Sequence, residues 1–315
     1  MTPDALATEA LARWGLEETP VTLVAERENH VFQVVSGTDR FALRLHRQGY
    51  CSPAELASEL AWMAALGDGG LGVPQPVPTS DGALFCEFEG RLVDMLTWLP
   101  GSPLGQTGTP LDVADRTGLF HRLGQSMADL HLVSDNWVPP SGFTRRAWDR
   151  DGLVGETPVW GRFWENPTLG PSDKALFEEL RDRLRQALDR LVATLDYGMI
   201  HADLVRENVL VDSGALYLID FDDSGFGFRL FDLATILLRN RNEPDFSDLK
   251  DALIAGYHSR RALDVAALDL FLLIRATTYA GWIVPRMSEP GSAERNNRFI
   301  QTIKDLAVPY LENSG

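Results

Sequence analysis

Residues 200–223 read IHADLVRENVLVDSGALYLIDFDD, and this stretch decides the fold. Two short apolar runs, VLV and LYLI, flank the turn-forming residues DSG at 212–214, so the pattern predicts a β-hairpin. A hairpin would bring Asn208, at the entrance of its first strand, close to Asp220, at the exit of its second. Both side chains carry the oxygen ligands that Mg²⁺ prefers, so the sequence predicts a metal site at this end of the hairpin.

Three residues of this stretch keep the intervals of the kinase catalytic loop, H-R-D-x-x-x-x-N, and these are His201, Asp203 and Asn208. In that loop the Asp receives the proton of the acceptor hydroxyl and the Asn holds a magnesium ion. Asp220 stands where the Asp of the D-F-G triplet would be, and Asp222 where its Gly would be. Either short motif alone is commonly a turn or a capped element, but their shared order and spacing predict phosphoryl transfer.

These residues resemble the aminoglycoside phosphotransferase and choline kinase superfamily, nearest to its type II homoserine kinase-like and stress-response kinase-like members. The resemblance rests on HADLVRENVL, LYLIDFDD and GFGFRLFDLATILL. It implies an α+β, protein-kinase-like fold of two lobes: a small N-lobe with an antiparallel sheet and one main helix, and a larger, mostly helical C-lobe.

The resemblance also implies roles for individual residues and two cofactors, ATP and Mg²⁺. Asp203 would be the catalytic base, and Asn208 and Asp220 would be the metal ligands. Asp232, in FDLA, would be the buried Asp that braces the catalytic loop, and His201 would give structural support.

Val205 departs from the family's pattern. Protein kinases carry a Lys two positions after the base, and many small-molecule kinases carry a His there. An apolar residue at this place removes a cation that would neutralise the transferring phosphoryl group. Arg206, next along the chain, is the candidate that could substitute for it.

The N-terminal part is expected to clamp the nucleotide, yet none of the chain's lysines, Lys174, Lys250 and Lys304, lies in it. An active kinase normally pairs a strand-borne Lys with the ATP phosphates and with a Glu of the following helix. By elimination Arg44 takes this role, within the alternating strand pattern RFALRLHRQG. Arg is not equivalent to Lys, but it binds phosphate and carboxylate bidentately. Similar members often carry LRxHR strands, so the resemblance implies that the substitution is tolerated.

The segment SPAELASELAWMAAL predicts the partner helix, with Ser52 as N-cap and Pro53 at the first helical position. Glu55 and Glu59 lie four residues apart, on one helix face. Glu55 is also at the capping-box position, three residues after Ser52. Glu59 is therefore the predicted partner of Arg44.

No Gly-rich phosphate loop and no Walker A motif occurs in the sequence. The turn at Glu28, Asn29 and His30 is expected to cover the phosphates instead, with backbone N–H groups and side chains. The alternative is that Asn29 or His30 only shapes a hairpin.

The segment LVDMLTWLPGSPLG ends an apolar strand in Pro and Gly residues, which predicts a domain boundary. We expect an N-lobe, the nucleotide clamp, over residues 1–95 and a C-lobe over residues 96–315, with the hinge, the catalytic loop and the acceptor site. The resemblance implies that adenine lies against the backbone of this hinge, at Met95, Thr97 and Leu99.

Acceptor recognition is expected in residues 134–172, which hold half of the chain's eight tryptophans, namely Trp137, Trp148, Trp160 and Trp164. One possibility is an aromatic box for a quaternary amine, where a cation over an indole gains roughly 0.5–2 kcal/mol. The favoured alternative is packing of a helical insertion, because Trp160, Phe163 and Trp164 have i, i+3, i+4 spacing.

Further acceptor-site candidates lie elsewhere in the chain. The segment LLIRATTYAGWIVPRM offers Arg275, Tyr279, Trp282 and Arg286 at spacings that put several on one helix face. An Arg near the acceptor would favour a substrate with a carboxylate, such as an amino acid. Asp222, within IDFDD, is a candidate as well.

The composition predicts one soluble enzyme. The 315 residues are 44% hydrophobic and carry a net charge of −16, which argues against nucleic-acid partners. No long apolar span or signal core is found, so no membrane association is expected. Two cysteines, Cys51 and Cys86, suit a reducing cytoplasm and provide no disulfide framework.

The sequence thus predicts an ATP- and Mg²⁺-dependent kinase that phosphorylates a hydroxyl of a homoserine-, amino-alcohol- or aminoglycoside-like metabolite. Three alternatives stay open. A Ser/Thr protein kinase would share the core, but the short connection from Asp223 to Phe231 leaves little room for an activation segment. A metal-dependent phosphohydrolase could use the His and Asp residues of the same stretch as ligands. A catalytically silent, nucleotide-binding pseudokinase would explain the missing Lys and Gly-rich loop.

Overall fold

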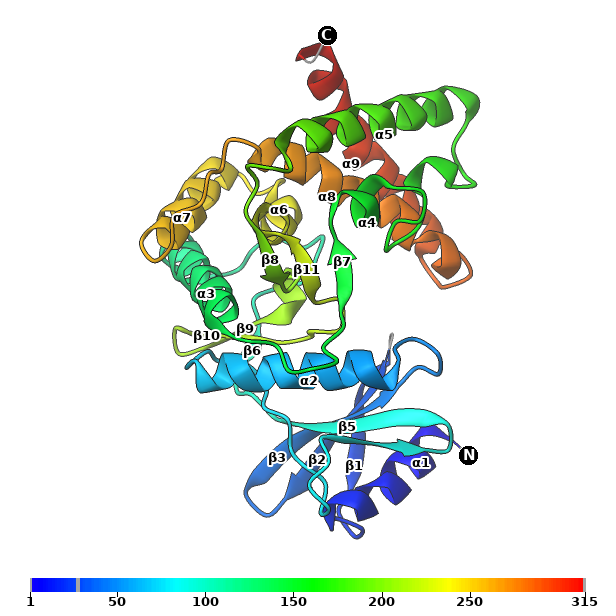
Figure 1. Cartoon of the computed structure of the whole chain (residues 1–315), viewed down its shortest axis with the longest axis vertical. Coiled ribbons are helices and arrows are strands. Elements are labelled where there is room, and N and C mark those ends of the chain that lie inside the picture. The colour runs from blue at the N-terminus through cyan, green and yellow to red at the C-terminus, as the bar shows by residue number, and fades with distance from the viewer. Residues whose placement is uncertain (1, 27–28, 314–315) are drawn as a thin grey trace. The chain divides into compact units, whose positions relative to one another are not determined.

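The computed structural model describes residues 2–26 and 29–313, which form two compact units (Figure 1). The first unit comprises the chain up to Leu104, with Leu132–Arg145 and Asn208–Asp222. The second comprises Gly105–His131, Arg146–Glu207 and the chain from Asp223 on. The sequence predicts one boundary, after residue 95, whereas each unit draws on several separate chain segments.

A five-stranded antiparallel sheet is the main layer of the first unit, in the order β1-β2-β3-β5-β4. Its strands are β1 (Val21–Glu26), β2 (Asn29–Ser36), β3 (Asp39–His46), β4 (Phe85–Phe88) and β5 (Arg91–Thr97). One face packs on α1 (Pro3–Ala10), where Leu6 and Ala10 join Phe32 and Leu43 in a buried cluster. This cluster anchors the strand that carries Arg44.

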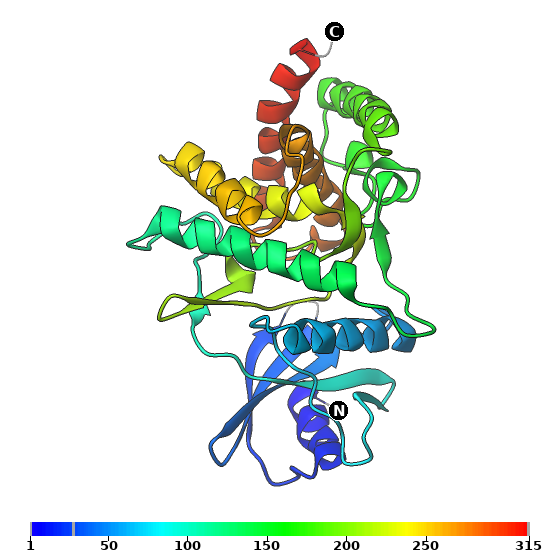
Figure 2. The ribbon, with the colours of Figure 1, turned by 60° about the vertical axis from the view of Figure 1, so that its left-hand side comes forward.

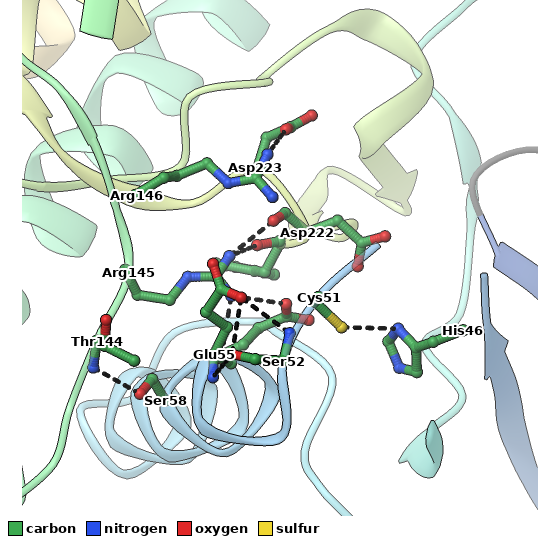
Figure 3. Close-up of polar contacts among 12 residues, drawn as sticks. His46, Cys51, Ser52, Glu55, Ser58, Thr144, Arg145, Arg146, Asp222 and Asp223 are labelled. Carbon is green, nitrogen blue, oxygen red and sulfur yellow. Dashed lines mark hydrogen bonds and ion pairs between the residues drawn. The ribbon is translucent and has the colours of Figure 1, made fainter. Parts of the chain in front are cut away.

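Helix α2 (Pro53–Asp68) begins as the sequence predicts. The Ser52 hydroxyl accepts a hydrogen bond from the Glu55 N–H, and the Glu55 carboxylate accepts one from the Ser52 N–H at 2.8 Å (Figure 3). The capping box is thereby confirmed. Further along the helix, the buried Trp62 donates to the Ser134 hydroxyl and lies edge-on to Phe221, at 5.5 Å between ring centroids. These contacts explain why segments distant in sequence belong to the first unit.

The predicted hairpin is confirmed: β9 (Val209–Asp212) and β10 (Ala215–Leu218) pair antiparallel, and β6 (Ser102–Pro103) adds to β9. Ser213 and Gly214 connect the two strands with φ of 49° and 89°. Positive φ at both positions is typical of two-residue hairpin turns, whose twist matches that of the strands. The two strand ends therefore come together at the opposite end of the hairpin.

The second unit is mostly helical, with a small sheet in the order β7-β11-β8 (Figures 1 and 2). Its strands are β7 (Arg146–Trp148), β8 (Tyr197–Ile200) and β11 (Gly225–Phe228). Its helices are α3 (Arg116–Asn136, which ends in the first unit), α4 (Arg150–Val154), α5 (Pro171–Leu191), α6 (Arg229–Asn240), α7 (Phe246–His258), α8 (Leu268–Trp282) and α9 (Ser292–Asn313). Over the described ranges, no helix has both the length and the apolar character needed to cross a membrane.

The helix predicted around Trp160 does not form. Only a short 3₁₀ turn forms there, over Phe163–Glu165, because Pro158 and Gly161 interrupt the chain before it, and Gly161 has a φ of 84°. The packing itself is confirmed, since the side chains of Phe163 and Trp164 are buried.

Helices α3 and α7 cross at two glycines. A Cβ atom on Gly124 would lie 2.0 Å from the Leu253 carbonyl oxygen, and one on Gly256 would lie 1.9 Å from the His121 carbonyl oxygen. Both distances are far too short for real atoms, and backbone cannot move aside as a flexible side chain can. The close crossing therefore depends on hydrogen at both positions.

We expect Gly124→Ala to lower the free energy of unfolding by about 1–3 kcal/mol, as overpacking of a fitted contact does. Urea unfolding, followed by circular dichroism, measures this. Gly105→Ala is the matched control, because its Cβ would meet only Arg206 Cδ at 3.5 Å, an ordinary contact. Equal stability of the two variants would contradict the crossing.

Candidate active site

The loop after β8 is held by the carboxylate of Asp232, from the first turn of α6. One carboxylate oxygen accepts the N–H of His201 at 2.9 Å, and the other accepts the N–H of Ala202 at 2.6 Å. Ala202 has a φ of 68°, a strained conformation for any residue other than glycine. The predicted brace is thus present as a contact, and it holds the backbone immediately before Asp203.

Asp232 is supported in turn by His131 of α3. His131 Nε2 lies 3.1 Å from Asp232, and its Nδ1 lies 2.7 Å from the Tyr257 hydroxyl. Burial, aided by the charge of Arg229, lowers the pKa of His131 to about 4, so the ring is neutral at pH 7. A neutral imidazole has one donor and one acceptor, so it donates to Asp232 and accepts from Tyr257. His131 therefore has a structural role as the support of Asp232.

Asp203 forms an ion pair that the sequence does not predict. Its Oδ1 lies 2.6 Å from Nη2 of Arg275, in the middle of α8. The Arg275 side chain is fully buried, while the Asp203 side chain is 23% exposed. One oxygen of the Asp203 carboxylate thus contacts the buried Arg275, while part of the side chain remains exposed to solvent.

Arg206 does not support the charge-neutralising role expected of it. Its side chain is buried, and its Nε donates to Asn240 at 2.9 Å. Its two terminal nitrogens donate to the Thr109 carbonyl at 2.7 Å and to Glu243 at 2.5 Å. Each guanidinium nitrogen is engaged within the second unit, so we correct the expectation: Arg206 fastens the loop to Asn240 at the end of α6, to Glu243 just after it and to Thr109.

Asn208 and Asp220 leave the same end of the β9–β10 hairpin, as predicted. The Ile219 N–H donates to the Asn208 carbonyl at 3.0 Å. Asp220, the next residue after Ile219, therefore lies near Asn208. Asp220 has a φ of 67° and an exposed side chain, whereas Asn208 is buried. An amide oxygen and a carboxylate suit Mg²⁺, which takes few protein ligands besides phosphate and water. Among the described residues, no group of three or more His, Cys, Asp or Glu side chains is arranged to hold a metal.

The first unit holds Arg44 of β3 among three carboxylates. Its Nη1 lies 2.9 Å from Glu59, the predicted helix partner, and 3.0 Å from Asp222. Its Nε and Nη2 lie 3.0–3.1 Å from Asp94, which is opposite Arg44 on β5. Burial lowers the pKa of the Arg44 guanidinium, but the three carboxylates more than offset this and raise it well above its usual value.

Asp94 was not among the predicted site residues, although it is fully buried. Its second partner is His46, whose Nε2 lies 2.5 Å from Asp94 Oδ1 and whose Nδ1 lies 3.8 Å from Cys51 Sγ (Figure 3). The available signal is a lone charge inside the apolar run LVDMLTWL, because a buried carboxylate needs a cation.

Arg145 is a second residue that the sequence does not single out. It bonds to Glu59 at 3.2 Å and to the backbone carbonyl oxygens of Glu55, Phe221 and Asp222 (Figure 3). Burial raises the pKa of Glu59, but Arg44 and Arg145 outweigh it and lower the pKa below its usual value. Arg145 therefore ties α2 to the strand exit that carries Asp220 and Asp222.

The predicted phosphate-covering turn lies partly outside the described residues, since Glu28 is among those not described. Asn29 begins β2, and its side-chain amide donates to the Asp222 carboxylate. His30 lies 3.3 Å from Glu26 of β1. These contacts are with the protein, and a role in covering phosphates stays a prediction.

Two of the three predicted hinge residues are already engaged. The Met95 carbonyl accepts the N–H of Val77, and the Thr97 N–H donates to the carbonyl of Gln75, both at 2.8 Å. A loop alongside β5 thus engages one backbone group of each residue, and an adenine contact at Met95 and Thr97 stays a prediction. Leu99, beyond the end of the strand, stays a predicted adenine contact.

The tryptophans considered for an aromatic box, and Trp282 of the acceptor candidates, already meet cations of the chain itself. Arg275 lies 4.5 Å from the ring of Trp160, Arg181 lies 4.0 Å from that of Trp164, and Arg286 lies 4.2 Å from that of Trp282. Trp148 instead stacks on Phe231, at 5.3 Å. Packing, the favoured alternative for these tryptophans, is therefore what the structure contains.

Asp223 connects Trp160 to the small sheet of the second unit. Its carboxylate lies 2.7 Å from Arg146 (Figure 3). The same carboxylate lies 3.3 Å from the Trp160 indole nitrogen. Its backbone carbonyl accepts the indole N–H of Trp148 at 2.8 Å. Acidic and aromatic side chains thus share one region of this unit.

The chain is similar in sequence and in fold to known proteins. The model of the phosphotransferase enzyme family (APH) matches residues 21–269. A homoserine kinase of Acidiphilium cryptum is 31% identical over 78% of this chain and 72% of its own length. A structure of a microcompartment-associated aminopropanol kinase aligns with a TM-score of 0.85 and 31% identity, over 99% of this chain and 98% of that one. These matches confirm the resemblance and the fold class expected from the sequence.

A structure with lower identity supports the fold alone. It is an amicoumacin kinase in complex with AMP-PNP, Ca²⁺ and Ami, which aligns with a TM-score of 0.77 at 20% identity. The alignment covers 97% of this chain and 94% of that one.

The His46–Asp94 contact predicts how stability depends on pH. Burial lowers the pKa of His46, but hydrogen bonds with Asp94 and Cys51 outweigh it and raise the pKa from 6.5 to about 10. A His whose pKa is raised on folding stabilises the folded state. The stabilisation is complete below the pKa of the unfolded chain, about 6.5, and is lost as pH rises through the folded-state pKa, about 10. We expect the free energy of unfolding to fall between pH 6.5 and 10 more steeply in the wild type than in His46→Gln.

Urea titrations at several pH values across this range measure the two slopes. Cys51→Ser, which keeps the Asp94 contact, should give a slope between them. Parallel curves for the wild type and His46→Gln would contradict the assignment.

Proposed function

Because the chain belongs to the phosphotransferase enzyme family, we propose that it transfers the γ-phosphoryl group of ATP, with Mg²⁺, to a hydroxyl of a small metabolite. The observation that carries the proposal is the loop from Asp203 to Asn208. Asp203 follows the backbone that Asp232 holds. Asn208 is hydrogen-bonded to Ile219, the residue before Asp220. Five residues of chain reach at most about 18 Å, so the base and the metal ligands are tethered to one another.

In this proposal Asn208 and Asp220 would hold Mg²⁺, which would supply positive charge to offset that of the ATP phosphates. Asp203 orients the acceptor hydroxyl and accepts its proton. The γ-phosphorus forms a bond to the acceptor oxygen as its bond to the bridging oxygen of ADP breaks. Most of the rate acceleration would come from alignment and charge stabilisation, since little covalent work falls to the protein.

Arg44 steadies the nucleotide phosphates in this proposal. Its Nε and Nη1 already donate to carboxylates, and its buried Nη2 lies 3.0 Å from Asp94 without a hydrogen bond to any of the described residues. A phosphate oxygen that binds Nη1 would therefore replace a carboxylate. Asp222 is the partner that we expect to give way, because its side chain is 10% exposed while those of Asp94 and Glu59 are 0% and 4% exposed. An anion would then still face the Arg44 guanidinium.

The acceptor that we propose is an amino alcohol. Homoserine and aminopropanol, the substrates named for two relatives, both carry a hydroxyl and an amine. The carboxylates of Asp203 and Asp223, in the second unit, suit an ammonium group. Arg286, over Trp282, would suit a carboxylate, which homoserine has and aminopropanol lacks.

The connection after Asp223 favours a small acceptor over a protein. Strand β11 begins at Gly225, and α6 follows at Arg229, so regular structure fills the segment where a protein kinase has its activation segment. The placement of Arg44 among three carboxylates favours the second candidate, a pseudokinase that binds nucleotide without turnover.

The test is ADP release from Mg-ATP with homoserine, aminopropanol, ethanolamine, choline, an aminoglycoside, a generic protein substrate, or no acceptor. We expect release that depends on an amino alcohol, and a loss of at least about 100-fold in Asp203→Asn with nucleotide binding retained, since a positioned base contributes this much or more. Release without acceptor would indicate a phosphohydrolase. ATP binding without any turnover would favour the pseudokinase.

A further inference from the structure

The residues that follow the base supply no cation near it. Val205 is apolar and 7% exposed, and the Arg206 guanidinium is engaged with Asn240, Glu243 and the Thr109 carbonyl. A positive charge nevertheless lies against the base, from a helix that is distant in sequence. Arg275 of α8 reaches Asp203 with Nη2 at 2.6 Å from Oδ1.

The surroundings of Arg275 fix its guanidinium in place. The rings of Trp160, Tyr279 and Phe231 lie 4.5, 4.4 and 5.1 Å from its central carbon. The Tyr279 hydroxyl lies 2.9 Å from the same Nη2 that contacts Asp203. A cation among aromatic rings is stabilised by their faces, and a fully buried one also requires an anion. Asp203 is the carboxylate that meets this requirement.

We propose that Arg275 is the positioning residue of the catalytic base, supplying from α8 the fixed charge that position 205 lacks. The inference rests on the proposed function. A charge-assisted hydrogen bond to Oδ1 fixes the rotation of the Asp203 carboxylate and stabilises its charge. Two restraints then act on the base: Asp232 holds the backbone before it, and Arg275 holds its side chain.

The same contact limits the acceptor. Because Arg275 faces Trp160 and Tyr279, these rings serve a cation of the protein, and the acceptor meets the exposed side of Asp203 instead. The ammonium of an amino alcohol would approach the carboxylates rather than an aromatic cage.

The test compares kcat and KM of Arg275→Met, Arg275→Lys, Asp203→Asn and the double variant Asp203→Asn/Arg275→Met, with Mg-ATP and the amino alcohol that the wild type turns over best. We expect Arg275→Met to lower kcat by roughly 100-fold with an unchanged KM for ATP, because a displaced base loses most of its contribution. Arg275→Lys should recover part of kcat. In the Asp203→Asn background, Arg275→Met should lower kcat no further, because it acts through the base.

Arg239→Met is the matched control. Its guanidinium also lies over Tyr279, at 4.0 Å, on an α6 side chain for which no contact with Asp203 is found among the described residues. It should keep kcat within about 2-fold of the wild type, because it removes a cation from the same ring without touching the base.

A double-mutant cycle on the Tm of the same variants tests the contact without an activity assay. Asp203→Asn leaves the charge of Arg275 buried and unpaired, so it should lower Tm, and adding Arg275→Met should restore part of the loss. Additive losses in Tm, or equal kcat in Arg275→Met and Arg239→Met, would overturn the role of Arg275. No turnover by the wild type with any acceptor would overturn the proposed function, and this inference with it.

Discussion

The Asp232 carboxylate is the constraint on which the second unit's site depends. Its two oxygens accept consecutive backbone N–H groups at 2.9 and 2.6 Å, and between them Ala202 adopts a conformation that few residues tolerate. A buried carboxylate in this place needs hydrogen-bond donors and no neighbouring anion. Neutral His131 is such a donor and carries no negative charge. The close crossing of α3 and α7 at two glycines sets the positions of His131 and Tyr257, so packing far from the base fixes its backbone.

Charge in this acidic protein is organised around buried arginines. Arg44 faces Asp94, Glu59 and Asp222 in the first unit, while Arg275 faces Asp203 in the second. Guanidinium groups suit such places because they stay charged and bind two carboxylate oxygens at once. Breaking one buried pair is costly because it leaves the partner's charge uncompensated. These clusters therefore hold the candidate site residues in defined orientations.

Local patterns in the sequence were sufficient for much of this architecture. The hairpin follows from two apolar runs around DSG, and the start of α2 from its N-cap and Pro. Arg44 and Glu59 could be paired because strand alternation and helix spacing each limit where a side chain points. Asp232 entered through family resemblance, and its contacts with the loop agree with that expectation.

The rest depends on contacts between residues far apart in the chain. Asp94 meets Arg44 through strand register, and Arg275 meets Asp203 through the packing of α8, across 72 positions of sequence. Arg206 turns toward the end of α6, where Asn240 and the following Glu243 lie, and no spacing around the catalytic loop reveals this. Met95 and Thr97 are engaged by a loop that returns beside β5. In each case a partner chosen by tertiary packing decides the role of a side chain or backbone group.

Direct transfer of the phosphoryl group to an acceptor hydroxyl is tested most directly by mass spectrometry of the products formed in ¹⁸O-labelled water. The enzyme, Mg-ATP and an amino alcohol should give a phosphorylated acceptor without ¹⁸O, because water takes no part in the transfer. Inorganic phosphate that carries one ¹⁸O atom, without a phosphorylated acceptor, would show that water is the acceptor and would contradict the kinase.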